Sequence, residues 1–274
     1  MRMFLFYRSG FAWPGLVLLT LAFTAPAVTA DTAPDVKTTT SERPASKPVR
    51  TRTLQPFRAE YRVSVSRVPT PIRAELVLEA GDTDGVYRMQ MSVDSRLMQN
   101  TELSIFRWED CQPYTQHYMH YFRGFRRERD HFMDFVWDSD TPRVINASTS
   151  NGEEELSEYD IEPGTVDELT MMLIAPCLMT DEQTEYSVTT AYGTRVREHH
   201  IQVVGHETLR TPLGEVETVR IEKRRDADSS RYTVFWLAPE LDYMLVRGRH
   251  VESRGLYGEL RLVDYEGPFS NASE

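Results

Sequence analysis

Histidines are the side chains of this 274-residue chain best suited to metal binding or acid–base chemistry. His117 and His120 are three residues apart, so on a strand they would point to opposite faces. The adjacent His199 and His200 are separated in the same way. His131 has acidic neighbours, but a surface or core histidine is the commoner arrangement. The chain also lacks the motifs of nucleophile elbows, phosphate loops and zinc proteases. We therefore expect no catalytic residue, no metal and no cofactor, and the sequence favours a non-catalytic protein.

A basic and aromatic segment between residues 114 and 137 is the strongest candidate for ligand binding. Its rings could contact the acyl chain of an amphiphile, and its guanidinium groups could bind an anionic head group. The alternative is a strand–turn–strand whose arginines pair with the many acids of the chain, because charge runs usually lie on solvated faces. The candidate binding residues are Tyr118, Phe122, Arg123, Phe125, Arg126, Arg127 and Arg129.

The first 30 residues have the pattern of a secretory signal peptide. Arg2 and Arg8 supply positive charge, Phe11–Phe23 is apolar, and Val28-Thr29-Ala30 resembles a cleavage site. An uncleaved anchor is the alternative, but the apolar stretch falls short of the ~20 residues that a spanning helix needs. The sequence thus predicts export to the periplasm and a mature form without a transmembrane segment.

The mature chain divides into three parts by composition. Residues 31–56 are rich in Thr, Pro, Ala, Ser and charge, which predicts a disordered linker. Residues 57–266 predict a single β-rich domain, and residues 267–274 a flexible tail.

Charge and cysteine content restrict the partners and the compartment. The net charge is −11, and removing Arg2 and Arg8 with the leader gives −13. This acidity argues against nucleic acid as a partner and against general binding to anionic surfaces. Cys111 and Cys177 are the only cysteines, and in an oxidising compartment they predict one disulfide. Two buried free thiols are the alternative.

The folded segment contains about a dozen short runs that alternate between apolar and polar residues. One helix is expected, with Thr165 and Glu168 forming a capping box, an apolar face of four residues, and Pro176 at its end. No strand–helix–strand alternation is present. The sequence therefore predicts a mainly β fold, an antiparallel meander that forms a curved half-barrel or barrel with one short capping helix.

Five short stretches carry a resemblance to a known family, namely Phe57–Tyr61, Gly164–Asp167, Gly205–Gly214, Trp236–Pro239 and Tyr243–Val246. On these features the segment from Phe57 to Tyr265 resembles a bacterial exported family known as domain of unknown function 3108. One departure is Phe135-Val136-Trp137, where the family often has Phe-Asp-Trp. The resemblance implies an exported, mostly β protein without an established activity. In outline the chain is also similar to the half-barrel lipoprotein carriers of the periplasm, by architecture alone.

Three functions are compatible with these observations. The first is a periplasmic binding or carrier module for an apolar or amphiphilic ligand, with a lipid, a lipoprotein or another envelope component as its partner. The second is a structural or interaction protein of the envelope without a small ligand. The third, less favoured, is a hydrolase that acts on envelope polymers or lipids.

Overall fold

The computed structural model describes residues 52–96, 98–124, 127–180, 182–224, 229–252 and 256–270. The predicted signal peptide, most of the predicted linker, two candidate binding residues (Phe125 and Arg126) and the end of the predicted tail lie outside these ranges. No helix in the described ranges is long and apolar enough to cross a membrane.

Fifteen strands form one sheet in the order β8-β7-β6-β5-β4-β3-β2-β1-β15-β14-β13-β12-β11-β10-β9. All neighbours are antiparallel except β9 and β10. The strands are β1 Phe57–Val65, β2 Val68–Ala80, β3 Val86–Asp94, β4 Met98–Glu109, β5 Gln112–Gly124, β6 Arg127–Val136, β7 Arg143–Ser150, β8 Glu153–Asp160, β9 Val166–Asp167, β10 Glu185–Tyr192, β11 Arg195–Thr211, β12 Gly214–Arg224, β13 Tyr232–Ala238, β14 Met244–Val251 and β15 Tyr257–Glu266.

Tight two-residue turns join several consecutive strands into hairpins. The turns at Ser66–Arg67, Asp110–Cys111 and Asn151–Gly152 each have two residues with positive φ. Such turns match the twist of the flanking strands, so they favour tight hairpins. Many strands bury alternate residues, most regularly β4, where every second side chain is buried. The predicted antiparallel meander is confirmed.

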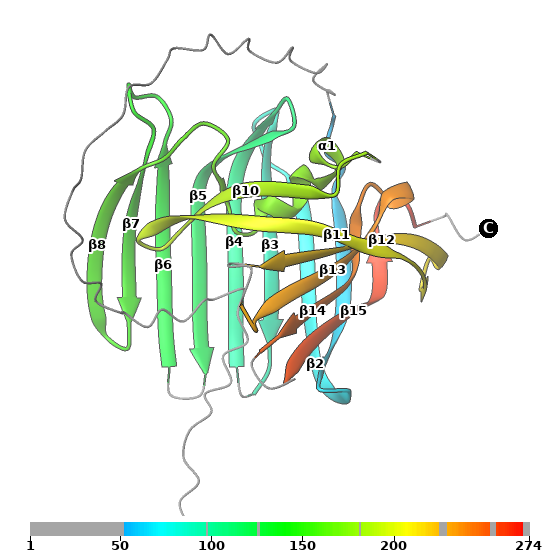
Figure 1. Ribbon diagram of the computed structural model, residues 1–274. Coiled ribbons are helices and arrows are strands. Elements are labelled where there is room, and N and C mark those ends of the chain that lie inside the picture. Colours follow the sequence, from blue (N-terminus) through cyan, green and yellow to red (C-terminus); the bar gives the residue numbers. More distant parts are fainter. Residues whose placement is uncertain are drawn as a thin grey trace, which may run out of the picture.

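The sheet curls on itself but does not close. Its middle is the pairing of β1 with β15, the first and last strands of the chain. From there β10 and β11 return across the front of β4, β5 and β6 (Figure 1). In the described structure the end strands β8 and β9 do not pair with each other, so the sheet is not a full barrel.

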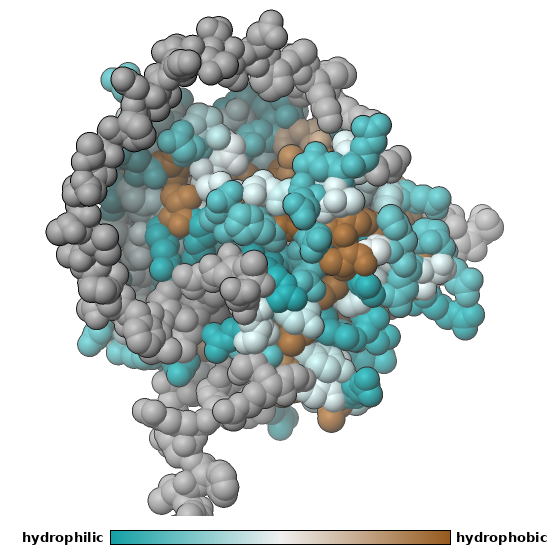
Figure 2. All heavy atoms as spheres, viewed as in Figure 1, coloured by the Kyte–Doolittle hydropathy of each residue, from teal (hydrophilic) through white to brown (hydrophobic). Residues whose placement is uncertain are grey.

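The apolar core lies between the facing parts of the curled sheet. Tyr61, Phe106, Met89 and Val144 are fully buried there. The Tyr61 hydroxyl donates to the carbonyl of Leu245 at 2.9 Å, which links β1 to β14 across the core. The face seen in Figure 2 is mostly hydrophilic, and hydrophobic residues appear on it as small separate groups.

The predicted helix is present but begins later than the sequence indicates. A 3-10 helix, η1 (Thr170–Ile174), leads directly into α1 (Ala175–Leu178), and a second short 3-10 helix, η2 (Pro239–Leu241), precedes β14. Pro176, predicted to end the helix, lies in the first turn of α1 instead. A proline is tolerated there because the first turn does not use its backbone N–H groups.

The predicted capping box is wrong because Asp167 supplies the acceptor at the helix start. Its Oδ1 accepts hydrogen bonds from the backbone N–H groups of Leu169 and Thr170, both at 2.8 Å. The residues of β9 are extended and paired with β10, so the helix cannot begin at Thr165. The buried Thr165 hydroxyl has no hydrogen-bond partner in the described structure. Glu168 makes its contacts in the interior instead.

Cys111 and Cys177 form a disulfide, as the sequence predicts, with their Cα atoms 6.0 Å apart. Cys111 lies in the turn between β4 and β5, and Cys177 lies in α1. The bridge therefore holds the helical segment against one end of the sheet.

Removing the disulfide should destabilise the fold. The bridge joins residues separated by 66 positions, and closing such a loop restricts the unfolded chain by about 4 kcal/mol in the chain-entropy model. We expect Cys111→Ser with Cys177→Ser to lower the free energy of unfolding by up to that amount in guanidinium titrations. Equal midpoints for the oxidised protein and this double variant would contradict the assignment.

Candidate functional site

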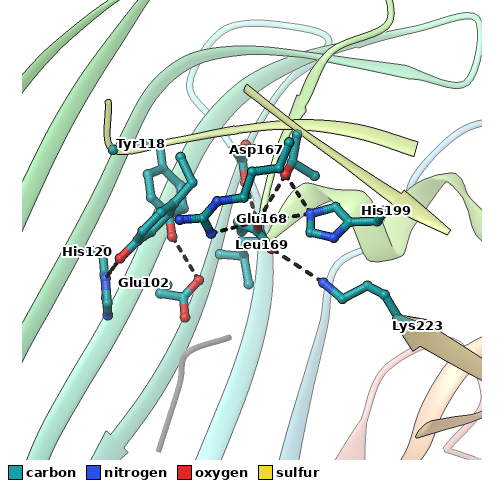
Figure 3. A network of polar contacts seen from close by, with 12 residues as sticks. Glu102, Tyr118, His120, Asp167, Glu168, Leu169, His199 and Lys223 are labelled. Atoms are coloured by element: carbon teal, nitrogen blue, oxygen red, sulfur yellow. Dashed lines mark hydrogen bonds and ion pairs between the residues drawn. The ribbon is translucent and has the colours of Figure 1, made fainter. Parts of the chain in front are cut away.

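A network of buried polar side chains crosses the interior where β9 and η1 meet the sheet (Figure 3). Asp167 is fully buried at its centre. Its Oδ2 accepts hydrogen bonds from the hydroxyls of Ser104 at 2.7 Å, Thr115 at 2.6 Å and Thr170 at 2.8 Å. Together with the two backbone donors at the helix start, these bonds saturate the carboxylate, as burial of a charge requires. Asp167 thus joins β9 to β4 and β5.

Glu168 points from the next position toward β10, β11 and β12. Its Oε1 accepts from the Thr190 hydroxyl at 2.9 Å and lies 3.1 Å from Nε2 of His199 and 3.8 Å from Nη1 of Arg197. Its Oε2 lies 3.5 Å from Nζ of Lys223. Two adjacent acids therefore bind side chains from five different strands.

Nearby cations determine the protonation state of Glu168. Burial alone would raise the pKa of Glu168, but Lys223, His199 and Arg197 together hold it below its usual range. Burial lowers the pKa of Lys223, although its pairing with Glu168 opposes that shift. Burial also lowers the pKa of His199. At neutral pH the network thus contains an ionised Glu168 beside a buried lysine.

Glu102 behaves differently because it has fewer donors. The Tyr118 hydroxyl donates to its Oε2 at 2.9 Å. Burial raises the pKa of Glu102 to about 7, since this bond does not offset the loss of solvent. Burial and the nearby Glu102 also raise the pKa of Tyr118 well above its ordinary value. Glu102 is therefore a buried carboxyl that changes charge near neutral pH.

His120 and His131 stack at the other end of the network, with ring centroids 6.2 Å apart. His120 is hydrogen-bonded through Nδ1 to the Tyr192 hydroxyl at 2.7 Å and through Nε2 to Oδ1 of Asn100 at 2.8 Å. Burial lowers the pKa of His120 to about 3 and that of His131 to about 4. Both rings are neutral at physiological pH. No group of three metal-binding side chains occurs among the residues that the structure describes.

The Glu168–Lys223 pair borders an apolar pocket of about 80 Å³ under η1 and α1. A second apolar pocket of about 230 Å³ lies next to it, and both have Met172, Leu237 and Leu245 in their walls. A larger groove of about 630 Å³ runs beside the disulfide, but none of the charged network lines it. The two apolar pockets are thus the cavities associated with the site.

The structure divides the predicted binding residues between two faces. Tyr118 and Phe122 are buried on the inner face of β5, and Arg129 is opposite Phe122 on β6. Arg123 points outward and pairs with Asp130 and Glu128. These residues therefore do not form one continuous surface. The remaining described candidate, Arg127, is exposed at the start of β6.

Sequence reasoning missed most of the buried network, although one signal was present. On β4, Glu102 points to the same buried side of the strand as Phe106. On β12, Lys223 points to the same buried side as Ile221. A charged residue on the buried side of a strand must find a partner inside the fold. The partner of Lys223, Glu168, lies 55 residues away in the chain, so spacing could not reveal it.

A family model described as "Protein of unknown function (DUF3108)" matches residues 60–260. No curated protein matches the chain.

Similar solved structures share little sequence. A β-barrel-like protein of domain of unknown function DUF1849 from Brucella abortus is 13% identical, with a TM-score of 0.43, and the match covers 78% of this chain and 98% of that one. A protein from Bacteroides fragilis described as exported, with a YmcC-like fold, is 12% identical, with a TM-score of 0.29, over 77% and 94% of the two chains. These similarities carry no argument about function.

Removing one charge of the Glu168–Lys223 pair should destabilise the fold more than removing both charges. Glu168→Gln leaves Lys223 without its counter-charge, and we expect a loss of about 3–5 kcal/mol in the free energy of unfolding. Adding Lys223→Met should recover part of that loss. Because the pKa of Glu168 is lowered on folding, its contribution is present at neutral pH and is lost as the pH falls.

Urea titrations at neutral pH would measure these changes. The matched control is Glu215→Gln, which removes an exposed partner of Arg210 and should cost less than about 1 kcal/mol. Equal effects of Glu168→Gln and Glu215→Gln would show that the buried pair does not organise the fold.

Glu102 should make stability depend on pH. In the unfolded chain its carboxyl ionises near 4.5, whereas in the folded chain it keeps its proton up to about 7. Stability therefore falls as the pH rises through this window, by about 3 kcal/mol in total. Glu102→Gln keeps an acceptor for Tyr118 but removes the titration. The stability of this variant relative to the parent should rise by that amount between pH 4.5 and pH 8, and a constant difference would refute the assignment.

Proposed function

Because the chain belongs to the DUF3108 family of proteins of unknown function, we propose a function from its interior: a non-catalytic binding or carrier protein of the cell envelope for an amphiphile with an acidic head group. The observation that carries this proposal is the Glu168–Lys223 pair in the wall of an otherwise apolar pocket. Small-molecule sites commonly combine an apolar lining with a few polar groups that orient the ligand.

The apolar part of the ligand has a suitable place beneath the helical segment. The walls of the smaller pocket include Met171, Ile221 and Phe235, and those of the larger one include Leu76 and Leu78. Met172 lies in the walls of both pockets, and methionine side chains adapt readily to a bound molecule. A shift of this side chain would join the two volumes, which together reach the lower end of the range for ligand pockets, about 300 Å³.

The acidic head group has a suitable partner in Lys223. Nζ of Lys223 lies 3.5 Å from Oε2 of Glu168, which is one of the longest contacts of this carboxylate. The other oxygen, Oε1, has closer partners in Thr190 and His199. Lys223 can therefore turn to a carboxylate or phosphate of the ligand while Glu168 keeps those two partners. A ligand anion would also compensate the charge of the buried ammonium group.

The other functions have less support. Thr190, His199 and Glu168 resemble a hydrogen-bonded acid–base set, but Thr190 and His199 are buried and line none of the four described cavities, which argues against an enzyme. An interaction role without a small ligand is favoured by one observation, an apolar outer edge. Phe132 and Leu156 are 41% and 81% exposed there, on β6 and the edge strand β8.

Two observations support a location in the cell envelope. The disulfide is typical of oxidising compartments. The leader sequence, which lies outside the described residues, predicts export to the periplasm through a cleavable signal peptide.

Binding of decanoate and of decanol, measured by calorimetry or native mass spectrometry, tests the proposal. We expect the protein to bind decanoate more tightly than decanol, and Lys223→Met to remove that preference because it removes the cation. Met172→Trp should fill the junction between the pockets and weaken the binding of both molecules at least tenfold.

The matched control is Met119→Trp, a change on β5 at a residue that lines neither pocket. It should leave binding unchanged. Failure of the parent protein to bind either molecule, or equal losses in the two tryptophan variants, would overturn the proposal.

A further inference from the structure

A groove of about 630 Å³ lies beside the disulfide and is the largest of the four described cavities. Its walls come from the turn between β4 and β5, the segment before β9, the helical segment and β10. In Figure 1, α1 lies above one end of β10, so the groove runs along an edge of the sheet. We call this cavity, which Cys111 and Cys177 line, the disulfide groove.

Part of the edge of β10 faces this groove with unpaired backbone groups. The N–H of Val203 donates to the carbonyl of Thr184 at 2.8 Å, so Thr184 and every second residue after it face β11. The N–H and carbonyl of Ser187 therefore point away from β11. On that side β9 pairs with β10 only at Thr190 and Ala191, so Ser187 has no strand partner there in the described part of the chain. A free strand edge can accept an extended peptide as an additional strand.

Thr165 supplies a second, independent indication of a ligand. Its side chain is buried, with 1% exposure, and its hydroxyl has no hydrogen-bond partner among the described residues. It lies in the wall of the groove, immediately before β9. A buried hydroxyl without a partner is costly, and a main-chain carbonyl of a bound segment would accept its hydrogen bond. A strand placed there would continue the line of β9 along the edge of β10.

The charge of the lining indicates a basic partner. Asp110 and Glu162 are exposed in the wall of the groove, and no arginine, lysine or histidine lines it. Neither acid forms an ion pair with another described residue. Glu198, opposite Thr189 on β11, adds a third exposed acid nearby. A lysine or arginine of a bound segment would therefore find carboxylates that the fold itself does not use.

The remaining lining suits the other side chains of a bound strand. Ile174, Leu178 and Met179 give part of the wall an apolar surface. Successive side chains of a strand point to opposite sides. The groove thus offers partners to both sets of side chains in a strand whose apolar and basic residues alternate.

We propose that the disulfide groove binds an extended basic segment of another protein, which pairs with the free edge of β10 as an additional strand. This inference is independent of the interior pocket and goes beyond the proposed ligand binding. A second copy of this chain is a poorer occupant, because the net charge of −11 makes two copies repel each other. Residues 31–51 of the chain itself contain cations, but their three prolines have no N–H to donate.

Calorimetry of the purified protein with a capped peptide of about six residues, in which valine and lysine alternate, tests the proposal. We expect this peptide to bind, and a form with glutamate in place of lysine to bind at least about tenfold more weakly because the acids repel it. N-methylation of alternate residues blocks the N–H groups on one side of the peptide. One of the two N-methylated forms should lose at least about tenfold in affinity because it cannot donate to the carbonyl of Ser187, and the other should stay within about twofold.

Neutral variants of the two acids test the charge complementarity. Asp110→Asn with Glu162→Gln should weaken binding of the lysine peptide at least about fivefold, because each exposed charge contact contributes up to about fivefold. Position 110 has a positive φ, which asparagine tolerates. The matched control is Glu153→Gln with Glu154→Gln, which removes the same charge from the exposed strand β8 and should change binding less than about twofold.

Amide hydrogen exchange at Ser187 identifies the occupant of the edge. We expect fast exchange in the free protein and protection when the peptide binds. Protection in the free protein at all concentrations would assign the edge to the chain itself, and protection that grows with protein concentration would assign it to a second copy. Either result would overturn the proposal, as would no peptide binding, equal affinities of the two N-methylated forms, or equal losses in the two double variants.

Discussion

The burial of two adjacent carboxylates, Asp167 and Glu168, is the constraint on which the rest of the structure depends. Charges taken out of water cost several kcal/mol each unless donors surround them. Here the donors come from β4 and β5 for Asp167 and from β10, β11 and β12 for Glu168. These strands meet only because the sheet curls on itself. The curl and the burial of the two acids therefore require each other.

The disulfide and the helical segment complete this arrangement. Asp167 positions the start of η1 through its backbone bonds, and Cys177 attaches α1 to the hairpin of β4 and β5. The helical segment thereby covers the apolar pocket beside Lys223. The elements that form the fold thus also form the wall of the proposed ligand site. Outside, the same curl places Arg62 and Arg261 side by side, although they are distant in the chain.

Local structure was predictable from the sequence, whereas contacts distant in the chain were not. Alternation of apolar and polar residues is a local signal, so it identified strands such as β1 and β3 and the antiparallel meander. The pairing of the two cysteines was predictable because the chain has no others. The predicted start of the helix was wrong because Asp167 lies in the extended strand β9. The pairing of β9 with β10 keeps it extended, and no local pattern shows that pairing. Arg123 and Tyr118 separated because neighbours on a strand alternate in direction.

The proposed interior site has a simple physical basis. Inside, a single ammonium group is buried with its counter-ion beside apolar side chains, which suits one acidic head group with one chain.

A crystal structure of the protein grown with decanoate would test the central claim most directly. The account predicts that the chain of the ligand lies between η1 and the strands β12–β14, with its carboxylate within hydrogen-bonding distance of Nζ of Lys223. Met172 should have moved to join the two pockets. A pocket filled only by protein side chains, with Lys223 still paired to Glu168 alone, would contradict the account.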